Sequence, residues 1–441
     1  MSSPAPARRR LAPAGLAALT LAVAVPAVLP VATPLAPAPA FAASKAKKKP
    51  AKPKYTVEGE LRKLRTAGSI TGKDLSAWRT LYRDVTARAK KAPKGTAKTE
   101  LLGVLQNTET IAARRELTAS IAPSVFLTLQ VNRDWWASKA APADRSRPVV
   151  DGSPLTWQYY KGEGLQIQWL ATFGLANALS TTTTPAKLEQ LRTIEDEALR
   201  LASTRAGGPA WQYLFDFGGG APPWGSGMAQ ATAMQSLVRT STKLGDPKYR
   251  ETALKAVQLL RTSSPTGARY KRPGGDHLLL YTFAKTRVLN AFSQTVSALH
   301  EISAATQDPK VNALYVRAER ELRAELPSYD LGNWARYNIG GAKETPSYHL
   351  LSRDNMRTLC RVLTADAGAF AVGQPVAGAQ PPAPAGPYCA MAERFTRDLT
   401  LTPNGPPARS RSVGGARLTV DTTGAVTDTG ASVAAPALSQ P

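Results

Sequence analysis

Apolar residues recur at spacings of three and four along most of the chain beyond residue 55. Leu75, Trp78, Leu81 and Val85 form one such stretch, which predicts an amphipathic helix. The same period predicts further helices over residues 187–204, 226–238, 248–262, 288–304, 311–326, 354–363 and 388–399. Residues 126–131 fit either a strand or a helix, and residues 278–281 predict a short strand. The chain is therefore expected to be mainly α.

Long connections rich in aromatic residues and glycine alternate with short turns between these helices. That alternation favours stacked antiparallel helix pairs, as in an α/α toroid, either incomplete or a six-hairpin helical barrel. A helical solenoid is the alternative, although its repeats should be more alike. The toroid domain is predicted over 56–403, with N-terminal helices at 56–140 and a core at 155–400. Residues 404–441 are predicted to be a loose tail, with a hairpin around Thr423-Gly424.

The first 42 residues have the features of a secretory signal peptide. Arg8, Arg9 and Arg10 precede a long apolar stretch, and Ala40-Phe41-Ala42 fits a small-x-small cleavage site. Prolines interrupt the apolar stretch, which argues against a retained membrane span. We therefore expect cleavage near Ala42 and a protein that is secreted or associated with the cell wall.

The net charge of +24 is high. Part of it lies in a segment rich in Lys, Pro and Ala, residues 43–55, which predicts a basic disordered linker. An exported protein this basic is drawn to anionic polymers. We expect an anionic polysaccharide as substrate and association with the cell wall or a membrane surface through the linker, and export argues against nucleic acid. A lineage bias toward basic composition is the alternative explanation of the charge.

Cys360 and Cys389 are the only cysteines. In an oxidising compartment they are candidates for one disulfide, which would close a loop of about 30 residues. Two cysteines do not form a structural zinc site, because such a site takes four ligands. The sequence contains no recognisable metal motif, and no cofactor is expected.

The stretch from Pro327 to Met356 is the richest in chemistry. It places three tyrosines, a tryptophan, a histidine and several charged residues between two predicted helices. Loops that hold such residues between rigid elements often carry function. A polar connecting loop whose aromatic residues pack on helix ends is the alternative.

Three motifs resemble the C-terminal catalytic domain of the D-glucuronyl C5-epimerase family. The first is Gln158-Tyr159-Tyr160-Lys161-Gly162-Glu163-Gly164-Leu165-Gln166, and the second is Pro223-Trp224-Gly225-Ser226-Gly227-Met228-Ala229-Gln230. The third runs from Tyr329-Asp330 through Tyr337 to Ser347-Tyr348-His349, and Val288-Leu289-Asn290 is similar to a helix start of the family. Their order and spacing agree over about residues 155–400.

The resemblance implies an α/α toroid that inverts C5 of a uronic acid within a polysaccharide. Removing the C5 proton leaves a carbanion delocalised onto the carboxylate, which requires stabilisation of charge and a proton-transfer group on each face of the sugar. The catalytic candidates carried over are Tyr281, Tyr337 and Tyr348. A nearby cation is expected to lower the pKa of such a tyrosine. The substrate-binding candidates are Tyr159, Tyr160, Lys161, Gln166, Trp224, Ser226, Gln230, Asn290, Trp334, Arg336, Lys343, His349 and Arg353. Among them Tyr159, Tyr160, Trp224 and Trp334 are expected to stack on sugar rings.

The sequence departs from the family pattern in two places. Leu280 stands where the family has an acidic residue before the tyrosine, and Asp276 or His277 is a candidate substitute. No arginine follows Tyr337 closely, and Ser352 takes the place of a second histidine. These departures keep three alternatives open: a polysaccharide lyase, a glycoside hydrolase, and a non-catalytic glycan-binding or cell-wall protein. A homodimer is also left open.

Overall fold

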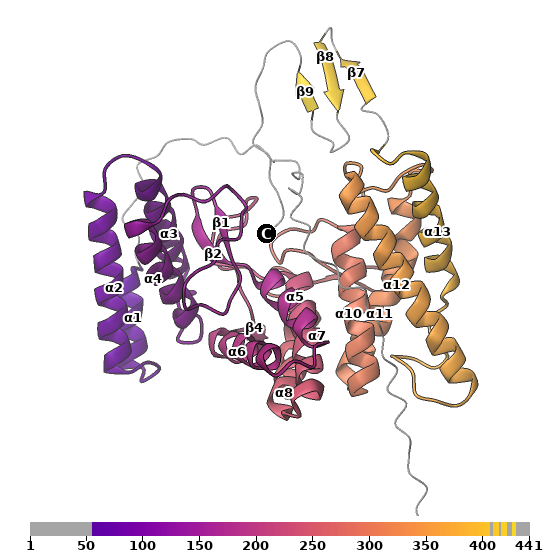
Figure 1. Ribbon diagram of the computed structural model, residues 1–441, viewed down its shortest axis with the longest axis horizontal. Helices are drawn as coiled ribbons and strands as arrows, with labels where there is room; N and C mark the ends of the chain where they lie inside the picture. Colours follow the sequence, from indigo (N-terminus) through magenta and orange to yellow (C-terminus); the bar gives the residue numbers. More distant parts are fainter. Residues whose placement is uncertain (1–54, 406–408, 414–415, 421–425, 429–441) are drawn as a thin grey trace, which may run out of the picture. The chain divides into compact units, whose positions relative to one another are not determined.

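The computed structural model describes residues 55–405, 409–413, 416–420 and 426–428 (Figure 1). These residues all lie within 34–441, one of two units into which the chain divides. The predicted signal peptide and nearly all of the predicted linker lie outside the described residues. No helix of the described part is long and apolar enough to cross a membrane.

Four helices form the N-terminal part: α1 (Val57–Thr66), α2 (Gly72–Lys91), α3 (Thr96–Ala113) and α4 (Ala122–Ser138). Helix α4 settles the ambiguous residues 126–131 as helix. Its Phe126 stacks on Trp78 of α2, with ring centroids 5.0 Å apart. Packing between helices decides the conformation where the local pattern is ambiguous.

The core consists of four consecutive helical hairpins. They are α5 (Trp169–Leu179) with α6 (Pro185–Leu201), α7 (Gly227–Leu244) with α8 (Pro247–Ala256), α10 (Leu289–Thr306) with α11 (Pro309–Tyr329), and α12 (Pro346–Ala371) with α13 (Gly386–Leu401). The first helices of successive hairpins contact each other, α5 with α7, α7 with α10 and α10 with α12. These four form an inner layer, and each packs its own hairpin partner on the outside. The fold is therefore mainly α, with the two-layered hairpin order of an α/α toroid.

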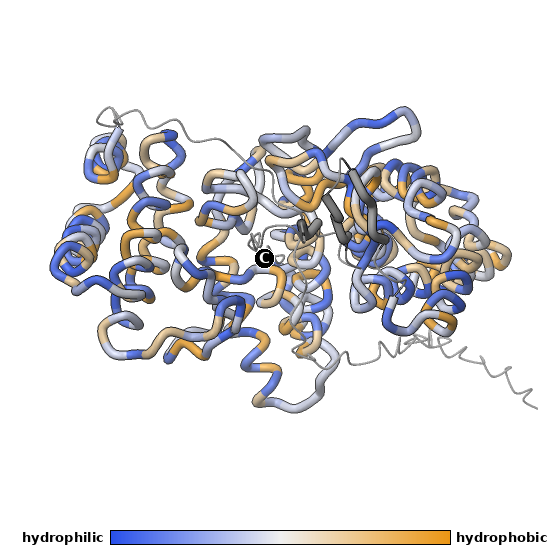
Figure 2. Tube along the Cα trace, turned by 90° about the horizontal axis from the view of Figure 1, so that it is seen from above, coloured by the Kyte–Doolittle hydropathy of each residue, from blue (hydrophilic) through white to orange (hydrophobic). Residues whose placement is uncertain are grey.

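Local sequence signals explain where these helices begin. Side chains of Gln168, Ser226 and Thr345 accept backbone N–H groups at the starts of α5, α7 and α12. The outer helices α6, α8 and α11 each begin with a proline, which suits a position with no hydrogen bond to lose. Hydrophobic and hydrophilic positions alternate every few residues along most helices, as expected when one face is buried (Figure 2).

Short antiparallel hairpins fill the connections. They are β1 (Trp157–Tyr160) with β2 (Gly164–Ile167), β3 (Ser203–Arg205) with β4 (Gly208–Ala210), and β5 (Arg269–Lys271) with β6 (Asp276–Leu278), and a short helix α9 (Gln258–Arg261) precedes the last of them. In the first hairpin Tyr159 pairs with Leu165. The strand predicted at residues 278–281 lies earlier in the chain, because only Leu278 of that range belongs to β6.

Two connections are shorter than the sequence predicts. Helix α12 begins at Pro346 and continues to Ala371, so Tyr348 and His349 lie on a helix rather than in a loop. The expected mobile loop over 368–387 is reduced at both ends by α12 and α13. Within the predicted tail the structure describes three strands, β7 (Arg409–Val413), β8 (Ala416–Val420) and β9 (Val426–Asp428), in one antiparallel sheet. The hairpin turn expected at Thr423-Gly424 lies outside the described residues.

A disulfide joins Cys360 of α12 to Cys389 of α13. The two cysteines are 29 residues apart in sequence, and their Cα atoms lie 4.8 Å apart. The bond therefore fixes the last hairpin, whose first helix carries Tyr348.

Candidate active site

The N-terminus of α7 holds the segment that contains Tyr281. The N–H of Gly227 donates to the carbonyl of Leu280 (3.2 Å), and that of Thr282 donates to the carbonyl of Gly225 (2.9 Å). Ser226 and Tyr281 form an antiparallel bridge between these bonds. Tyr281 is thereby fixed beside the first turn of an inner helix.

Tyr337 and Tyr348 are fixed in the same way at the next two inner helices. The N–H of Leu289, the first residue of α10, donates to the carbonyl of Tyr337 (3.0 Å). Tyr348 lies in the first turn of α12, where its N–H donates to the Oγ1 of Thr345 (3.3 Å). The Tyr337 and Tyr348 rings meet edge to face, with centroids 5.0 Å apart.

Tyr281, Tyr337 and Tyr348 form what we call the tyrosine cluster. Burial raises the pKa of Tyr281 well above its usual value, and interactions with Tyr337 and Tyr348 raise it further. Burial likewise raises the pKa values of Tyr337 and Tyr348. The expectation of a cation-lowered tyrosine pKa is therefore wrong for this state of the protein, because all three phenols hold their protons at neutral pH.

The Tyr348 hydroxyl is buried and has no hydrogen-bond partner among the described residues. Both polar atoms of the Asn290 side chain, on the first turn of α10, are likewise buried without a partner in that part of the chain. Leaving such groups unpaired costs about 1–3 kcal/mol each. Unpaired polar groups next to a set of protonated tyrosines are what a site for a polar ligand requires.

Aromatic side chains surround Tyr281. Its ring stacks on Phe283 at 5.3 Å and meets the rings of Trp224 and Phe217 edge on, at 5.4 Å and 5.6 Å. Trp224 also stacks on Tyr213 at 4.4 Å. These rings fix the orientation of Tyr281 and form its apolar surroundings.

Leu280 offers no acid at the site. It packs in an apolar cluster with Met228, Val288 and Ala291. The two proposed substitutes point elsewhere: the Asp276 carboxylate accepts from Arg317 (2.7 Å), and the His277 Nδ1 lies 2.9 Å from Glu325. Both are buried against α11, so neither takes the position of the missing acid.

A carboxyl group to which the sequence assigns no role at the site lies beside the cluster. Glu344 is buried, and its charge interacts with Tyr337 and Tyr348. Its oxygens accept from Ser352 (2.6 Å) and lie 3.3 Å from the His349 Nδ1. Burial raises the pKa of Glu344. The signal was Ser352, which stands where the family has a second histidine and here bonds this acid.

The His349 ring is enclosed in the interior rather than turned toward a ligand. It stacks on Trp334 at 3.9 Å and contacts Phe395 at 4.7 Å. Its Nε2 lies 3.8 Å from the Asp398 carboxylate. His349 therefore connects two acids behind Tyr348, and the substrate contact predicted for it is not available in this arrangement.

The four aromatic residues expected to stack on sugars are also interior. Tyr159, Tyr160, Trp224 and Trp334 are each at most 3% exposed. The Tyr159 hydroxyl donates to Glu100 (2.9 Å), and the Trp334 indole N–H donates to the carbonyl of Glu344 (2.8 Å). The prediction that these rings stack on sugars is wrong for this arrangement, because they are buried and present no open face to a sugar. Sequence shows that a residue is aromatic but not which neighbour covers it.

The predicted polar contacts divide similarly. Ser226 caps α7, Gln166 donates to the carbonyl of Glu163 (2.6 Å), and Gln230 donates to the carbonyls of Pro209 and Ala256. All three are used structurally. Asn290 is the exception, since its amide is unpaired in the described structure.

Arg336 and Arg353 are bonded to groups outside the tyrosine cluster. Arg336 donates to the carbonyl of Gly341 (3.1 Å), and Arg353 pairs with Asp354 (2.7 Å). Lys161 is exposed at the tip of the first hairpin. Arg336 and Lys343 form a backbone bridge that brackets Tyr337, so these two cations lie nearest to it along the chain.

The hairpin β1–β2 is built into the wall by a buried acid. Glu100 of α3 accepts the N–H groups of Gly162 (2.8 Å) and Gly164 (2.9 Å). A Cβ on Gly164, which has φ +73°, would approach the Asn132 Oδ1 to 2.4 Å. The glycines of the first motif therefore have a structural role that the sequence did not show. At the tip, Glu163 accepts from Asn107 (2.7 Å), and burial raises its pKa to about 7.

Among the described residues, no group of three His, Cys, Asp or Glu side chains is placed to hold a metal ion. The tyrosine cluster itself offers three protonated phenols, the buried carboxyl group of Glu344 and the unpaired amide of Asn290.

Similarity to solved structures is weak. A sugar epimerase from a ruminal bacterium aligns at 13% identity over 53% of this chain with a TM-score of 0.38, and this chain spans 59% of its length. An endo-β-1,4-glucanase from Acetobacter xylinum aligns at 14% identity, covering 56% of this chain and 93% of its own, with a TM-score of 0.33. A GH76 α-mannanase from Bacteroides thetaiotaomicron aligns at 11% identity, covering 74% and 96%, with a TM-score of 0.35. No relative was found among curated proteins.

Residues 208–367 match the family model described as D-glucuronyl C5-epimerase C-terminus. The match covers less than half of the chain, but it contains the tyrosine cluster and the helices α7, α10 and α11. It begins after the β1–β2 hairpin, which carries the first of the three motifs. The match to this family model over residues 208–367 confirms the resemblance found in the motifs of that segment.

Proposed function

We propose that this protein inverts C5 of uronic acid residues in an acidic polysaccharide, by removal and return of the C5 proton at the tyrosine cluster. The observation that carries the proposal is the convergence of Tyr281, Tyr337 and Tyr348. They come from three separate segments, and each is fixed at the start of a different inner helix. The matched epimerase domain contains all three.

The arrangement suits a substrate whose charge grows during the reaction. Loss of the C5 proton spreads negative charge onto the uronate carboxylate, which needs hydrogen-bond donors. Protonated phenols are such donors, and one of them can also return a proton to carbon. The N-termini of α7, α10 and α12 lie at the same place, and their dipoles favour a negative group.

Removal of the proton requires a base, which a protonated phenol is not. We assign this step to a tyrosinate of the cluster. Tyr337 is the first choice, because its ring meets that of Tyr348 inside the segment that the backbone bridge between Arg336 and Lys343 closes. The same bridge makes these cations the candidates to hold the substrate carboxylate. Glu344, whose charge interacts with Tyr337 and Tyr348, is our candidate to accept the phenol proton that must leave to form the tyrosinate.

We further propose that the protein is exported and acts outside the cell. The support is the signal-like segment with its Ala40-Phe41-Ala42 site, together with the disulfide between Cys360 and Cys389, which suits an oxidising compartment. The basic linker would hold the enzyme near anionic wall polymers.

A second candidate is a non-catalytic relative that binds acidic glycans. The observation in its favour is Leu280, which is buried among apolar side chains where the family has an acid. Such a protein would keep the binding groups and lack the turnover.

Product analysis separates these functions. The protein is incubated with polymers of D-glucuronate, and the products are examined by proton NMR. Inverted C5 centres in intact chains support the proposal. Unsaturated uronate indicates a lyase, new reducing ends indicate a hydrolase, and binding without any product indicates the non-catalytic relative.

A further inference from the structure

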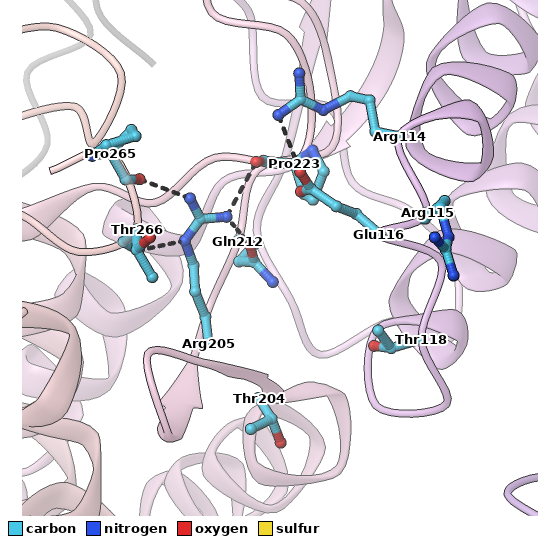
Figure 3. A pocket seen from close by; sticks show the side chains of 10 residues that line it. All are labelled: Arg114, Arg115, Glu116, Thr118, Thr204, Arg205, Gln212, Pro223, Pro265 and Thr266. Atoms are coloured by element: carbon cyan, nitrogen blue, oxygen red, sulfur yellow. Dashed lines mark hydrogen bonds and ion pairs between the residues drawn. The ribbon is translucent and has the colours of Figure 1, made fainter.

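A cavity lined by none of the residues of the tyrosine cluster lies where the end of α3 meets the strand β3 and the loop around Pro265 (Figure 3). Its volume is about 350 Å³, within the range of small-molecule sites. Three arginines line it, Arg114, Arg115 and Arg205, together with one acid, Glu116. The four side chains carry a net charge of +2.

Arg205 lines this cavity, and four of its five N–H donors are used by neutral acceptors. It donates to the carbonyl oxygens of Thr266 (2.7 Å), Pro265 (2.8 Å) and Pro223 (3.2 Å). It also donates to the Gln212 side chain (2.7 Å), and no carboxylate of the described residues pairs with it directly. Burial lowers the pKa of Arg205, because removing a cation from water disfavours its charged form. Such a charge is ordinarily compensated by an anion.

The rim supplies the groups that an anion would contact. Arg114 is already paired with Glu116 (2.9 Å), and Glu116 neutralises the charge of this arginine. Arg115 has no carboxylate partner among the described residues, and its guanidinium lies 5.0 Å from the centre of the Tyr55 ring. Its φ of 61° is unusual for a residue with a side chain and turns the chain at the cavity mouth. Both arginines are exposed, so an incoming ligand can reach them.

The cavity is separate from the tyrosine cluster yet shares its supporting segments. Gln212 and Pro223 line the cavity, and the residues that follow them, Tyr213 and Trp224, stack in the aromatic wall around Tyr281. The cavity and the surroundings of Tyr281 are therefore built on the same two segments. The inference does not rest on the proposed reaction, since an anion site is useful to any glycan-binding protein.

We propose that this cavity, lined by Arg114, Arg115 and Arg205, is a binding site for an anionic group, namely a carboxylate or sulfate carried by an acidic glycan. A free inorganic anion has the same chemistry, so the test uses both sources. The specific contact is assigned to Arg115 on the rim, with Arg205 contributing charge from below.

Calorimetric titration tests the proposal with three probes: a tetra-uronate, sodium sulfate, and a neutral tetraglucan of the same length. Arg115→Gly removes the cation and is compatible with the positive φ, whereas Arg115→Lys keeps the charge. Lys187→Gln removes one charge from an exposed position on α6 and serves as the control. Thermal melting verifies that each variant is folded.

We expect the tetra-uronate to bind and the neutral tetraglucan not to bind. Arg115→Gly should weaken tetra-uronate binding about tenfold, the loss expected from one charge-assisted hydrogen bond. Arg115→Lys should restore most of the affinity, and Lys187→Gln should change it less than twofold. Sulfate binding with the same dependence on Arg115, but no tetra-uronate binding, would support the anion site and overturn the glycan as its ligand. Equal effects of Arg115→Gly and Lys187→Gln, or no binding of either anion, would overturn the site itself.

Discussion

Replacing Tyr348 by Phe removes one oxygen atom that the structure marks as costly. That hydroxyl is buried and has no partner among the described residues, while the ring stays packed against Tyr337. An unsatisfied buried hydroxyl costs about 1–3 kcal/mol. Tyr348→Phe should therefore leave the free energy of unfolding unchanged or raise it by about 1 kcal/mol. The same change should abolish C5 inversion, because it removes a proton donor of the cluster.

Tyr159→Phe is the matched control, since it makes the same chemical change in another buried tyrosine. The Tyr159 hydroxyl donates to the buried Glu100 carboxylate at 2.9 Å. Its loss leaves a charged acceptor with one donor fewer, which should destabilise the fold by about 1–3 kcal/mol. Activity per folded molecule should be retained. Tyr348→Phe should therefore lose activity and keep its stability, whereas Tyr159→Phe should lose stability and keep its activity.

Chemical denaturation followed by tryptophan fluorescence gives the stability of both variants, and product NMR gives their activity. A Tyr348→Phe protein that unfolds more easily than the wild type would show that the hydroxyl is bonded structurally. A stable Tyr348→Phe protein with wild-type activity would remove Tyr348 from the mechanism.

Three further predictions concern pH and covalent structure. Burial raises the pKa of Glu195 to about 8, so the wild type should lose stability as pH rises from 4.5 through 8, by up to about 5 kcal/mol. Glu195→Gln should lack this loss when melting is measured across that pH range. Stability that falls with pH equally in both proteins would contradict the prediction. Because burial raises the tyrosine pKa values, C5 inversion should speed up about tenfold per pH unit between 7 and 10, and a flat profile would exclude a tyrosinate base. Replacing Cys360 and Cys389 by Ala should lower the free energy of unfolding, measured with denaturant, by about 3–4 kcal/mol. Reduction of the disulfide in the wild type should lower it by the same amount. An unchanged free energy of unfolding would show that the bond is dispensable.

Much of the fold follows from the sequence because its signals are local. Apolar spacing of three and four predicts most of the helices, and the cap Ser226 predicts where α7 starts. The order of the motifs identified the epimerase-like domain. These features depend on neighbours within a turn or two of helix, which a single sequence displays.

The rest depends on contacts between distant segments. The hairpin β1–β2 forms because Glu100, some sixty residues earlier, accepts the N–H groups of Gly162 and Gly164. The aromatic residues Trp224 and Trp334 looked like sugar platforms, and only their packing partners show that they are interior. Glu344 is one of several acids that the sequence offers, and nothing in its local sequence shows that it will be buried beside two tyrosines.

The central claim is that the tyrosine cluster moves the C5 proton, and isotope exchange measures that step directly. The wild type and a variant with Tyr281, Tyr337 and Tyr348 all replaced by Phe are incubated with D-glucuronate polymers in deuterated water. Deuterium at C5 is then quantified by mass spectrometry. We expect deuterium at C5 in intact chains with the wild type and none above background with the folded triple variant. Equal incorporation by both proteins, or none by the wild type on any uronate polymer it binds, would contradict it.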